Sequence, residues 1–403
     1  MVNGFVVVGM LCAVGAAVLL VSLWVEHSIG ITLPAPTGPF AVGREIYDWV
    51  DETTVDSLSP VSGAKRELLV WIWYPAAATE RGETEDYFPV SMRRMIERGN
   101  GVLNSKFLTR DLAKVKTHSV RDAGIDMHQQ AYPVVLFRSG ASQEVANYSA
   151  LAEDLASHGY VVVGFDAPYR TFVVVFPDGR VVKRTRENNP ELCAEKSGVD
   201  QDKCASRLLN VWTADGSFVL DRLQTMNAAN GSSKFAGRLD MKRVGIFGHS
   251  FGGAAAAQFC RQDSRCKAGI DIDGALHGSV IRMGIDRPFL ILLSDHSKEF
   301  DGETQQIKSD LQSFYDRSPA ESRRYLAIRG ANHFMFSDDG ALLKSHFIRG
   351  AFRAFGKLGM DGDRQIAVTA YCVESFFDRY LKGESISTSA FSSSLYPEVQ
   401  ALE

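Results

Sequence analysis

The sequence predicts an α/β protein in which a mostly parallel central sheet is flanked by helices. From residue 132 onward, short apolar runs typical of buried strands alternate with segments of helical periodicity. Strand, helix and strand at this spacing form a βαβ unit, and the pattern recurs along the chain. A hydrophobic content of 45% and a charged content of 23% are those of a globular protein. A net charge of -4 gives no electrostatic case for binding nucleic acid.

The N-terminal segment departs from this globular composition. Residues 5–25 (FVVVGMLCAVGAAVLLVSLWV) carry no charge and are long enough to cross a bilayer as one helix. No Lys or Arg precedes the segment and no small-residue cleavage site follows it, so an uncleaved anchor over residues 1–30 is favoured over a cleaved signal peptide. We therefore expect a membrane-anchored chain whose domain lies outside the cytoplasm, or a secreted or periplasmic domain if the segment is removed.

Four of the six cysteines lie in two close pairs. Cys193 and Cys204 flank a polar stretch, and Cys260 and Cys266 bracket the short polar loop CRQDSRC. Close pairs in hydrophilic segments predict two local disulfides, which form in an oxidising compartment. Cys372 lies on an apolar helix face, where a core position is expected. No Cys/His spacing in the sequence resembles a metal site.

The globular domain is expected over residues 31–383 and opens with an antiparallel pair of strands at 42–50 and 67–74. The parallel strands are expected at 132–137, 160–165, 244–247, 268–272, 289–293 and 325–328. Helices are expected at 148–158, 212–226 and 366–381. Residues 171–210 interrupt the alternation with a charged stretch and predict a lid-like insertion. The Ser-rich residues 384–403 predict a flexible tail.

The strongest functional motif is GHSFG at 248–252. An apolar strand runs into this motif and an Ala-rich helix follows it. Gly-x-Ser-x-Gly between a strand and a helix is the nucleophile elbow, a strained turn that lifts the serine hydroxyl above the sheet. Ser250 is therefore the candidate nucleophile, and the expected architecture is the α/β-hydrolase fold.

A serine nucleophile needs a base that takes its proton, and in this fold the base follows the serine along the chain. His277, His296, His333 and His346 follow Ser250. His333 comes after an apolar strand and the turn RGAN, in the last part of the domain. This is where the fold places its base, so His333 is the candidate.

Two carboxylates could orient that base. Asp273 follows the strand at 268–272, and Asp295 follows the next strand at 289–293. The general fold more often uses the later strand, which favours Asp295, whereas some families use the earlier one. Spacing alone leaves both open.

Eight segments, spread along the chain in order, carry a family resemblance. They are LPAPTGPFAVG (33–43), WYPA (73–76), YPVVLF (132–137), LAEDLASHGYVVVGFDAPYR (151–170), GHSFGGA (248–254), DIDGALHG (271–278), IRGANHFMF (328–336) and FFDRYLKG (376–383). On these segments the domain from Leu33 to Leu381 resembles the plasma-type platelet-activating-factor acetylhydrolases and their bacterial carboxylic ester hydrolase relatives.

The resemblance implies Asp273 as the acid that accompanies Ser250 and His333. It also implies the backbone N–H groups of Phe251 and Ala141 as the oxyanion hole. The implied reaction is hydrolysis of short acyl esters, such as acetylated phospholipids or other small esters, through an acyl-enzyme, and it uses no metal or organic cofactor.

Two stretches depart from the family pattern. Where relatives read Ser-His-Gly-x-Gly, this chain has RSGAS at 138–142, and residues 171–210 have no clear counterpart. Both departures bear on the identity of the substrate. The alternative is a cutinase-like polyesterase or general carboxylesterase, with Asp295 as the acid. A non-catalytic, membrane-tethered binding module is a remote alternative, because such modules typically lose a member of the catalytic set.

Overall fold

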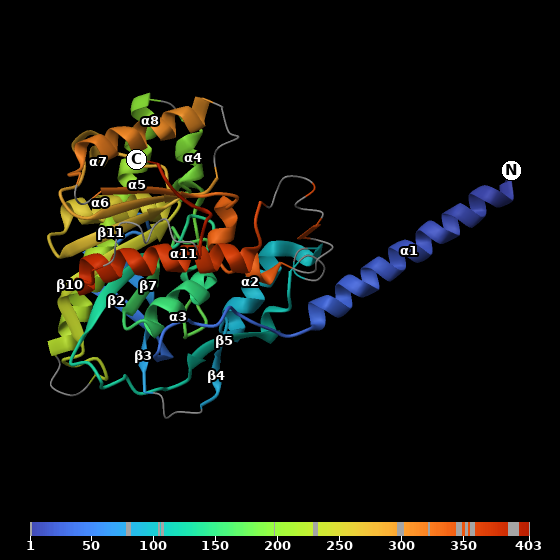
Figure 1. Cartoon of the computed structure of the whole chain (residues 1–403), viewed down its shortest axis with the longest axis horizontal. Helices are drawn as coiled ribbons and strands as arrows, with labels where there is room; N and C mark the ends of the chain where they lie inside the picture. Colours follow the sequence, from blue (N-terminus) through green and yellow to red (C-terminus); the bar gives the residue numbers. More distant parts are fainter. Residues whose placement is uncertain are drawn as a thin grey trace.

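The computed structural model of the chain describes residues 2–77, 82–103, 105, 109–196, 198–228, 233–295, 302–320, 323–343, 349–350, 354, 359–385 and 395–402. Two of the candidate bases, His296 and His346, lie outside these described residues. Figure 1 shows a single layered α/β domain with one long helix, α1 (Val2–Ser28), that projects away from it.

A 12-stranded sheet forms the centre of the described domain, in the order β1-β5-β2-β3-β7-β6-β10-β11-β12-β13-β14, with β4 paired to β5. Its strands are β1 (Ile31–Thr32), β2 (Ala41–Val55), β3 (Lys65–Ala76), β4 (Thr84–Asp86), β5 (Val115–Val120), β6 (Tyr132–Arg138), β7 (Val161–Asp166), β10 (Leu239–His249), β11 (Cys266–Ile272), β12 (Phe289–Leu293), β13 (Arg323–Ile328) and β14 (Val399–Ala401). The six strands from β7 to β13 are parallel, and β2 and β3 form the expected antiparallel pair.

Helices cover both faces of the sheet (Figure 1). On one face, α3 (Ser149–Ser157) and α11 (Gly362–Phe377) pack their apolar side chains against the strands. On the other face lie α5 (Gly198–Ala228), α6 (Phe251–Gln262), α7 (Ser279–Met283) and α8 (Gly302–Arg317). Strands that are buried on both faces read as continuous apolar runs, which is why the sequence locates them well.

The remaining described elements are shorter. They are α2 (Val90–Leu103), η2 (Leu112–Lys114), η3 (Val145–Tyr148), η4 (Arg186–Asn188), α4 (Glu191–Ala194), η5 (His333–Phe336), α9 (Asp339–Leu342), the π-helical turn η6 (Asp378–Lys382) and a separate hairpin of β8 (Val173–Val175) and β9 (Val181–Lys183).

Two elements differ from the sequence-based expectation. Helix α5 begins at Gly198, well before the expected start at 212. The sequence did not indicate these first turns because they are polar and exposed, and only Ala205, Leu208 and Leu209 continue the apolar face there. At the C-terminus, residues 399–401, expected within a flexible tail, form β14, which pairs antiparallel with the edge strand β13. The tail prediction is therefore wrong for these residues, since backbone pairing to an open sheet edge leaves little trace in side-chain composition.

Helix α1 is fastened to the domain at its C-terminal end. The carbonyl oxygens of Glu26 and Ser28 accept hydrogen bonds from the side chains of Arg110 (3.0 Å) and Lys114 (2.7 Å), and His27 Nδ1 lies 3.0 Å from the carbonyl of Thr109. The most apolar 18-residue stretch of Phe5–Ser28 has a mean hydropathy of 2.7, and none of that stretch is buried in the domain. This is the one helix of the described chain that is long and apolar enough to cross a membrane.

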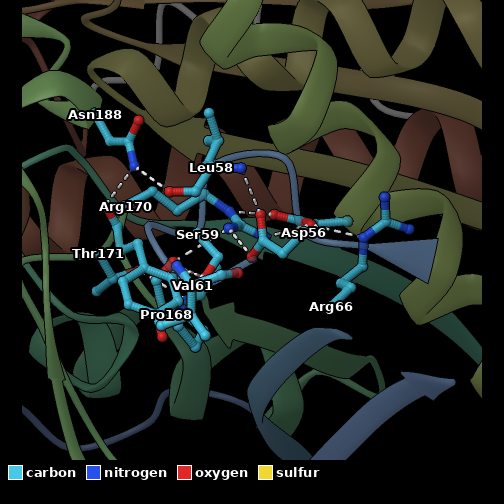
Figure 2. A network of polar contacts seen from close by, with 12 residues as sticks. Asp56, Leu58, Ser59, Val61, Arg66, Pro168, Arg170, Thr171 and Asn188 are labelled. Atoms are coloured by element: carbon cyan, nitrogen blue, oxygen red, sulfur yellow. Dashed lines mark hydrogen bonds and ion pairs between the residues drawn. The ribbon is translucent and has the colours of Figure 1, made fainter. Parts of the chain in front are cut away.

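The segment expected as an insertion is tied to the domain by a buried polar network (Figure 2). Arg170, fully buried, donates two hydrogen bonds to Asp215 on α5 (2.8 and 2.9 Å) and one to Asp56 in the β2–β3 connection (2.7 Å). Asn188 of η4 donates to the carbonyl of Leu58 at 2.8 Å. Bidentate pairing of an arginine with a carboxylate gives geometric specificity. The network therefore fixes where α5 and the segment before it sit against the sheet.

Both expected disulfides are present. Cys193 of α4 is bonded to Cys204 of α5, and Cys260 at the end of α6 is bonded to Cys266 at the start of β11. Cys372 is a buried free cysteine, as expected from its place on the apolar face of α11.

Candidate active site

The elbow at Ser250 has the strained geometry that the motif predicts. Ser250 joins β10 to α6 with φ 56° and ψ -128°, a conformation that non-glycine residues rarely adopt. A Cβ added at Gly248 would lie 2.1 Å from the carbonyl oxygen of Gly252, and one added at Gly252 would lie 2.4 Å from that of Arg138. The two glycines are therefore required by close backbone approach. The N–H of Ser250 donates to the carbonyl of Ile272 at 2.8 Å, which fastens the turn to β11.

The structure brings Asp273 and His333 together. Asp273 follows β11 with φ 56°, and its Oδ2 lies 2.7 Å from Nδ1 of His333. Ser294 donates both its backbone N–H (2.8 Å) and its hydroxyl (2.7 Å) to the same carboxylate. The carboxylate is buried and the imidazole is one-third exposed. A buried, fully hydrogen-bonded carboxylate can therefore hold the imidazole in one orientation and one tautomer.

Asp295 lies one residue beyond Ser294 and has a different partner. Its Oδ2 accepts a hydrogen bond of 2.8 Å from the backbone N–H of Gly330, and its own N–H donates to the carbonyl of Ala331 at 3.1 Å. These contacts hold the turn that precedes His333. In this geometry Asp295 supports the loop of the candidate base, His333, whereas Asp273 contacts His333 itself.

A cavity of about 200 Å³ opens beside these residues. It is lined by Ser250, Asp273 and His333 together with Gly274, Ala275, Leu293, Ile307, Lys308 and Leu311. Helix α8 thus supplies one wall, which is apolar except for Lys308. Larger hollows of the described surface, on the outer side of α5 and around the Cys193–Cys204 bond, are lined mainly by polar and charged side chains.

The two candidate oxyanion donors lie on either side of the elbow. Phe251 is the first residue of α6, so its N–H is one of the free N–H groups at the start of a helix. Ala141 follows β6 in a loop that packs directly on the elbow, because a Cβ added at the neighbouring Gly140 would lie 3.3 Å from Cβ of Ser250. Ala141 packs in one apolar cluster with Phe251 and Trp212 of α5, and its carbonyl accepts a hydrogen bond from Arg184.

Arg138 occupies the first position at which this chain departs from the family pattern. Its guanidinium is fully buried, lies over the rings of Trp212 (4.1 Å) and Phe165 (4.8 Å), and donates to the carbonyl of Phe165. Burial lowers the pKa of Arg138 to about 10, which still leaves it charged at neutral pH. The residue therefore anchors the base of the β6 loop to α5.

His249, inside the elbow motif, points into the protein and contacts the candidate base. Its ring is buried, its centroid lies 4.6 Å from that of His333, and its Nδ1 lies 2.6 Å from the hydroxyl of Tyr148. Burial, and to a smaller extent the neighbouring His333, lowers the pKa of His249 from 6.5 to about 3. His249 therefore remains neutral in the folded protein at physiological pH.

This depressed pKa predicts a specific loss of stability in acid. Below pH 6.5 the unfolded chain binds a proton at His249 that the folded chain does not bind until about pH 3. The free energy of unfolding should therefore fall by up to about 1.4 kcal/mol per pH unit between these values from this group alone. Urea unfolding of wild type and His249→Gln between pH 6.5 and 4 checks this, with His128→Gln, an exposed histidine, as control. Equal slopes in wild type and His249→Gln would contradict it.

Sequence reasoning missed two features of the site. The first is Ser294, which donates a hydrogen bond to the Asp273 carboxylate. Its position directly after β12, at the same edge of the sheet, could have indicated this contact. The cavity wall on α8 was also missed, although Ile307 and Leu311 are four residues apart and so lie on one face of that helix. His277 lies 6.1 Å from the ring of Phe251 and does not line the cavity.

Within the described residues, one group has the composition of a metal site, namely Asp154, His158 and Glu374, whose ligand atoms lie within 4.8 Å of one another. Its members already pair with each other and with the chain. His158 Nε2 lies 2.9 Å from Glu374, and Asp154 accepts hydrogen bonds from the backbone and hydroxyl of Thr37. The group joins α3 to α11 on the sheet face opposite α6.

The mostly parallel sheet, the strained serine between strand and helix, and the histidine–carboxylate pair that follows later strands define a hydrolase of the α/β-hydrolase class. The family model described as "Platelet-activating factor acetylhydrolase, isoform II" matches residues 26–170 and 203–384. The chain belongs to this family. The internal residues that the family model leaves unmatched, 171–202, fall within the segment 171–210 that was expected as an insertion.

Individual relatives agree with this assignment. A probable 1-alkyl-2-acetylglycerophosphocholine esterase of Arthroderma benhamiae is 27% identical over 396 residues, which cover 92% of this chain and 94% of the relative. A platelet-activating factor acetylhydrolase of Cavia porcellus is 25% identical over 222 residues, which cover 52% of this chain and 49% of the relative. The solved structure of a ferulic acid esterase from Streptomyces cinnamoneus superposes with a TM-score of 0.74 at 29% identity, covering 93% of this chain and all of the other. The protein is a carboxylic ester hydrolase.

Proposed function

We propose that the protein hydrolyses short-chain acyl esters, with an acetylated glycerophospholipid as the natural class of substrate, by a serine mechanism at Ser250. The observation that carries the proposal is the 2.7 Å contact between Asp273 and His333 at the edge of a cavity that Ser250 also lines. The names of the relatives supply the substrate class.

In the proposed mechanism, Ser250 Oγ attacks the acyl carbonyl while His333 takes the hydroxyl proton, and Asp273 orients and stabilises the imidazolium. The backbone N–H groups of Phe251 and Ala141 stabilise the oxyanion. His333 then returns the proton to the leaving alcohol oxygen. In the second step His333 removes a proton from water, the resulting hydroxide attacks the acyl-enzyme, and Ser250 regains its proton as the carboxylic acid leaves.

The size of the cavity favours a short acyl group. Its volume of about 200 Å³ is smaller than the roughly 300–1,000 Å³ of ordinary small-molecule pockets. Leu293, Ile307 and Leu311 line it with apolar side chains, next to Lys308. A small apolar cavity accepts an acetyl group and excludes a long chain.

We further propose that α1 anchors the protein in a membrane, with the domain on the oxidising side. The exposed apolar span Phe5–Ser28 has the length of a membrane helix, and the two disulfides fit an oxidising compartment. Removal of the span would give a secreted or periplasmic enzyme. Anchoring near the lipid surface suits an amphiphilic ester substrate.

The experiment is a substrate series with the full chain in detergent micelles. We expect kcat/KM to fall about 10- to 100-fold from p-nitrophenyl acetate to p-nitrophenyl octanoate. We also expect turnover of a 1-alkyl-2-acetyl phosphocholine and no turnover of a long-chain phosphatidylcholine. Ile307→Ala should raise the relative rate on octanoate, whereas Ile281→Ala, a half-buried isoleucine on α7 outside the cavity lining, should not.

Turnover of two further classes of substrate can contradict the proposal. A cutinase from Thermobifida alba is 24% identical over 204 residues, covering 50% of this chain and 54% of the relative, so polyester film belongs in the series. A feruloyl ester belongs there as well, because the superposed structure is that of a ferulic acid esterase. Preference for either of these over the acetyl phospholipid would replace the proposed substrate class and leave the esterase mechanism in place.

A further inference from the structure

A chain of hydrogen bonds runs behind His333 and links three loops of the site. His249 Nδ1 lies 2.6 Å from the hydroxyl of Tyr148, and that hydroxyl lies 2.5 Å from Oε1 of Gln143. Gln143 Nε2 donates to the hydroxyl of Ser337 at 2.7 Å, and Ser337 donates to the carbonyl of Phe334 at 3.0 Å. The chain therefore starts in the elbow, passes through the β6 loop and ends in the turn that carries His333.

The direction of every proton in this chain follows from its last member. Ser337 has one hydroxyl proton and gives it to a carbonyl, so its oxygen must accept from the amide of Gln143. The other end of that amide, Oε1, can only accept, so the Tyr148 hydroxyl donates to it. The Tyr148 oxygen then accepts from His249, which must carry its proton on Nδ1. The fold thus selects one tautomer of His249.

The imidazole of His249 packs on that of the candidate base, His333. The ring of His249 lies 4.6 Å from that of His333 and 5.6 Å from that of Phe336, so it fills the space behind the base. On its other side, a Cβ added at Gly140 would lie 3.2 Å from His249 Nδ1. His249 is therefore in contact with both the β6 loop and the base.

We infer that Tyr148 and His249 are positioning residues, which hold the imidazole of His333 and the β6 loop in a fixed relation so that base and oxyanion donors meet the same acyl group. The inference rests on the proposed esterase function. It gives a role to the buried polar ring at position 249.

Charged or titratable groups surround Tyr148 and His249, and both residues stay neutral. His333 and Asp273 face His249, whose pKa burial lowers to about 3. Asp338, Asp339 and Glu144 lie near Tyr148, and burial raises its pKa well above the ordinary value, so its hydroxyl keeps its proton. A neutral His249 adds no full positive charge beside His333 when that residue takes the proton of Ser250.

The test is Tyr148→Phe in the full chain in detergent micelles. The ring keeps its packing on Phe137, with centroids 4.8 Å apart, and the hydroxyl link is lost. We expect kcat for p-nitrophenyl acetate to fall about 10- to 100-fold with KM changed less than about 2-fold, because misplacement of the base affects the transition state. Adding Gln143→Leu should lower kcat little further, since both substitutions break one chain, although it also removes the 2.8 Å bond from Gln143 to Asp339 and should lower the melting temperature. The low-field proton resonance of the His333–Asp273 hydrogen bond should shift or broaden.

The matched control is Tyr160→Phe, which removes another buried tyrosine hydroxyl, here bonded to Asp378 at 2.6 Å on the face covered by α11. It should lower the melting temperature by a similar amount and leave kcat and the low-field resonance unchanged. Wild-type kcat in Tyr148→Phe, or an equal loss in both variants, would overturn the inference. If wild type does not turn over the ester, the proposed function fails. The resonance then still decides the positioning role, which is overturned if Tyr148→Phe leaves it unchanged.

Discussion

Ser250→Ala is expected to abolish ester turnover, with kcat lowered by about 10⁶-fold. The hydroxyl oxygen is the atom that attacks the acyl carbon in the proposed mechanism, and no other hydroxyl lines the cavity of about 200 Å³ among the described residues. The substitution removes one atom and keeps the β-carbon, so the strained turn at φ 56° and the hydrogen bond from the Ser250 N–H to Ile272 should persist. Folding should therefore be retained.

Two measurements check this prediction. The rate of p-nitrophenyl acetate hydrolysis is compared with Ser217→Ala, which removes a serine hydroxyl bonded to Asp263 on the outer side of α5 and should leave turnover intact. A fluorophosphonate probe should add one mass adduct to wild type and none to Ser250→Ala. Substantial residual turnover in a folded Ser250→Ala, or an adduct on a different residue, would contradict the assignment of the nucleophile.

The parallel sheet could be predicted from sequence because its strands are buried on both faces. Strands such as β6 and β12 appear as short, uninterrupted apolar runs, and the βαβ rule then fixes their direction. The elbow could be predicted because its close backbone contacts admit only glycine at 248 and 252. Constraints of this kind act on neighbouring residues, so they can be recognised in a short stretch of sequence.

The features that escaped prediction depend on contacts between distant parts of the chain. The start of α5 is polar and is positioned by the Arg170–Asp215 pair, and β14 adds to a sheet edge through backbone bonds. The hydrogen-bond chain from His249 to Ser337 joins loops that are far apart in the sequence. Neither periodicity nor motif spacing records such contacts.

The choice between the two candidate acids illustrates the same limit. Asp273 and Asp295 each follow a parallel strand at the same sheet edge, so spacing could not separate them. In the structure Asp273 contacts the imidazole at 2.7 Å, whereas Asp295 contacts the backbone of Gly330. This difference leads to the second large prediction, which compares the two asparagine variants.

Asp273→Asn should lower kcat by about 10⁴-fold. An ionised carboxylate only accepts hydrogen bonds, and Asp273 accepts from Ser294 N–H, from Ser294 Oγ and from His333 Nδ1. An amide has one acceptor oxygen, which at the Oδ1 position would keep the bond from Ser294 N–H, so the NH₂ at the Oδ2 position would face both the imidazole and Ser294 Oγ. His333 would then be held with its proton on Nε2, where it cannot take the proton of Ser250, and no negative charge would stabilise the imidazolium.

Asp295→Asn should stay within about tenfold of wild type, because an amide oxygen can still accept the bond from the backbone N–H of Gly330. Steady-state kinetics on p-nitrophenyl acetate, together with melting temperatures, separate the two cases. A dead Asp295→Asn beside an active Asp273→Asn would move the acid to the later strand. It would also mean that the Asp273–His333 contact is replaced when substrate binds, since one imidazole Nδ1–H has a single strong acceptor.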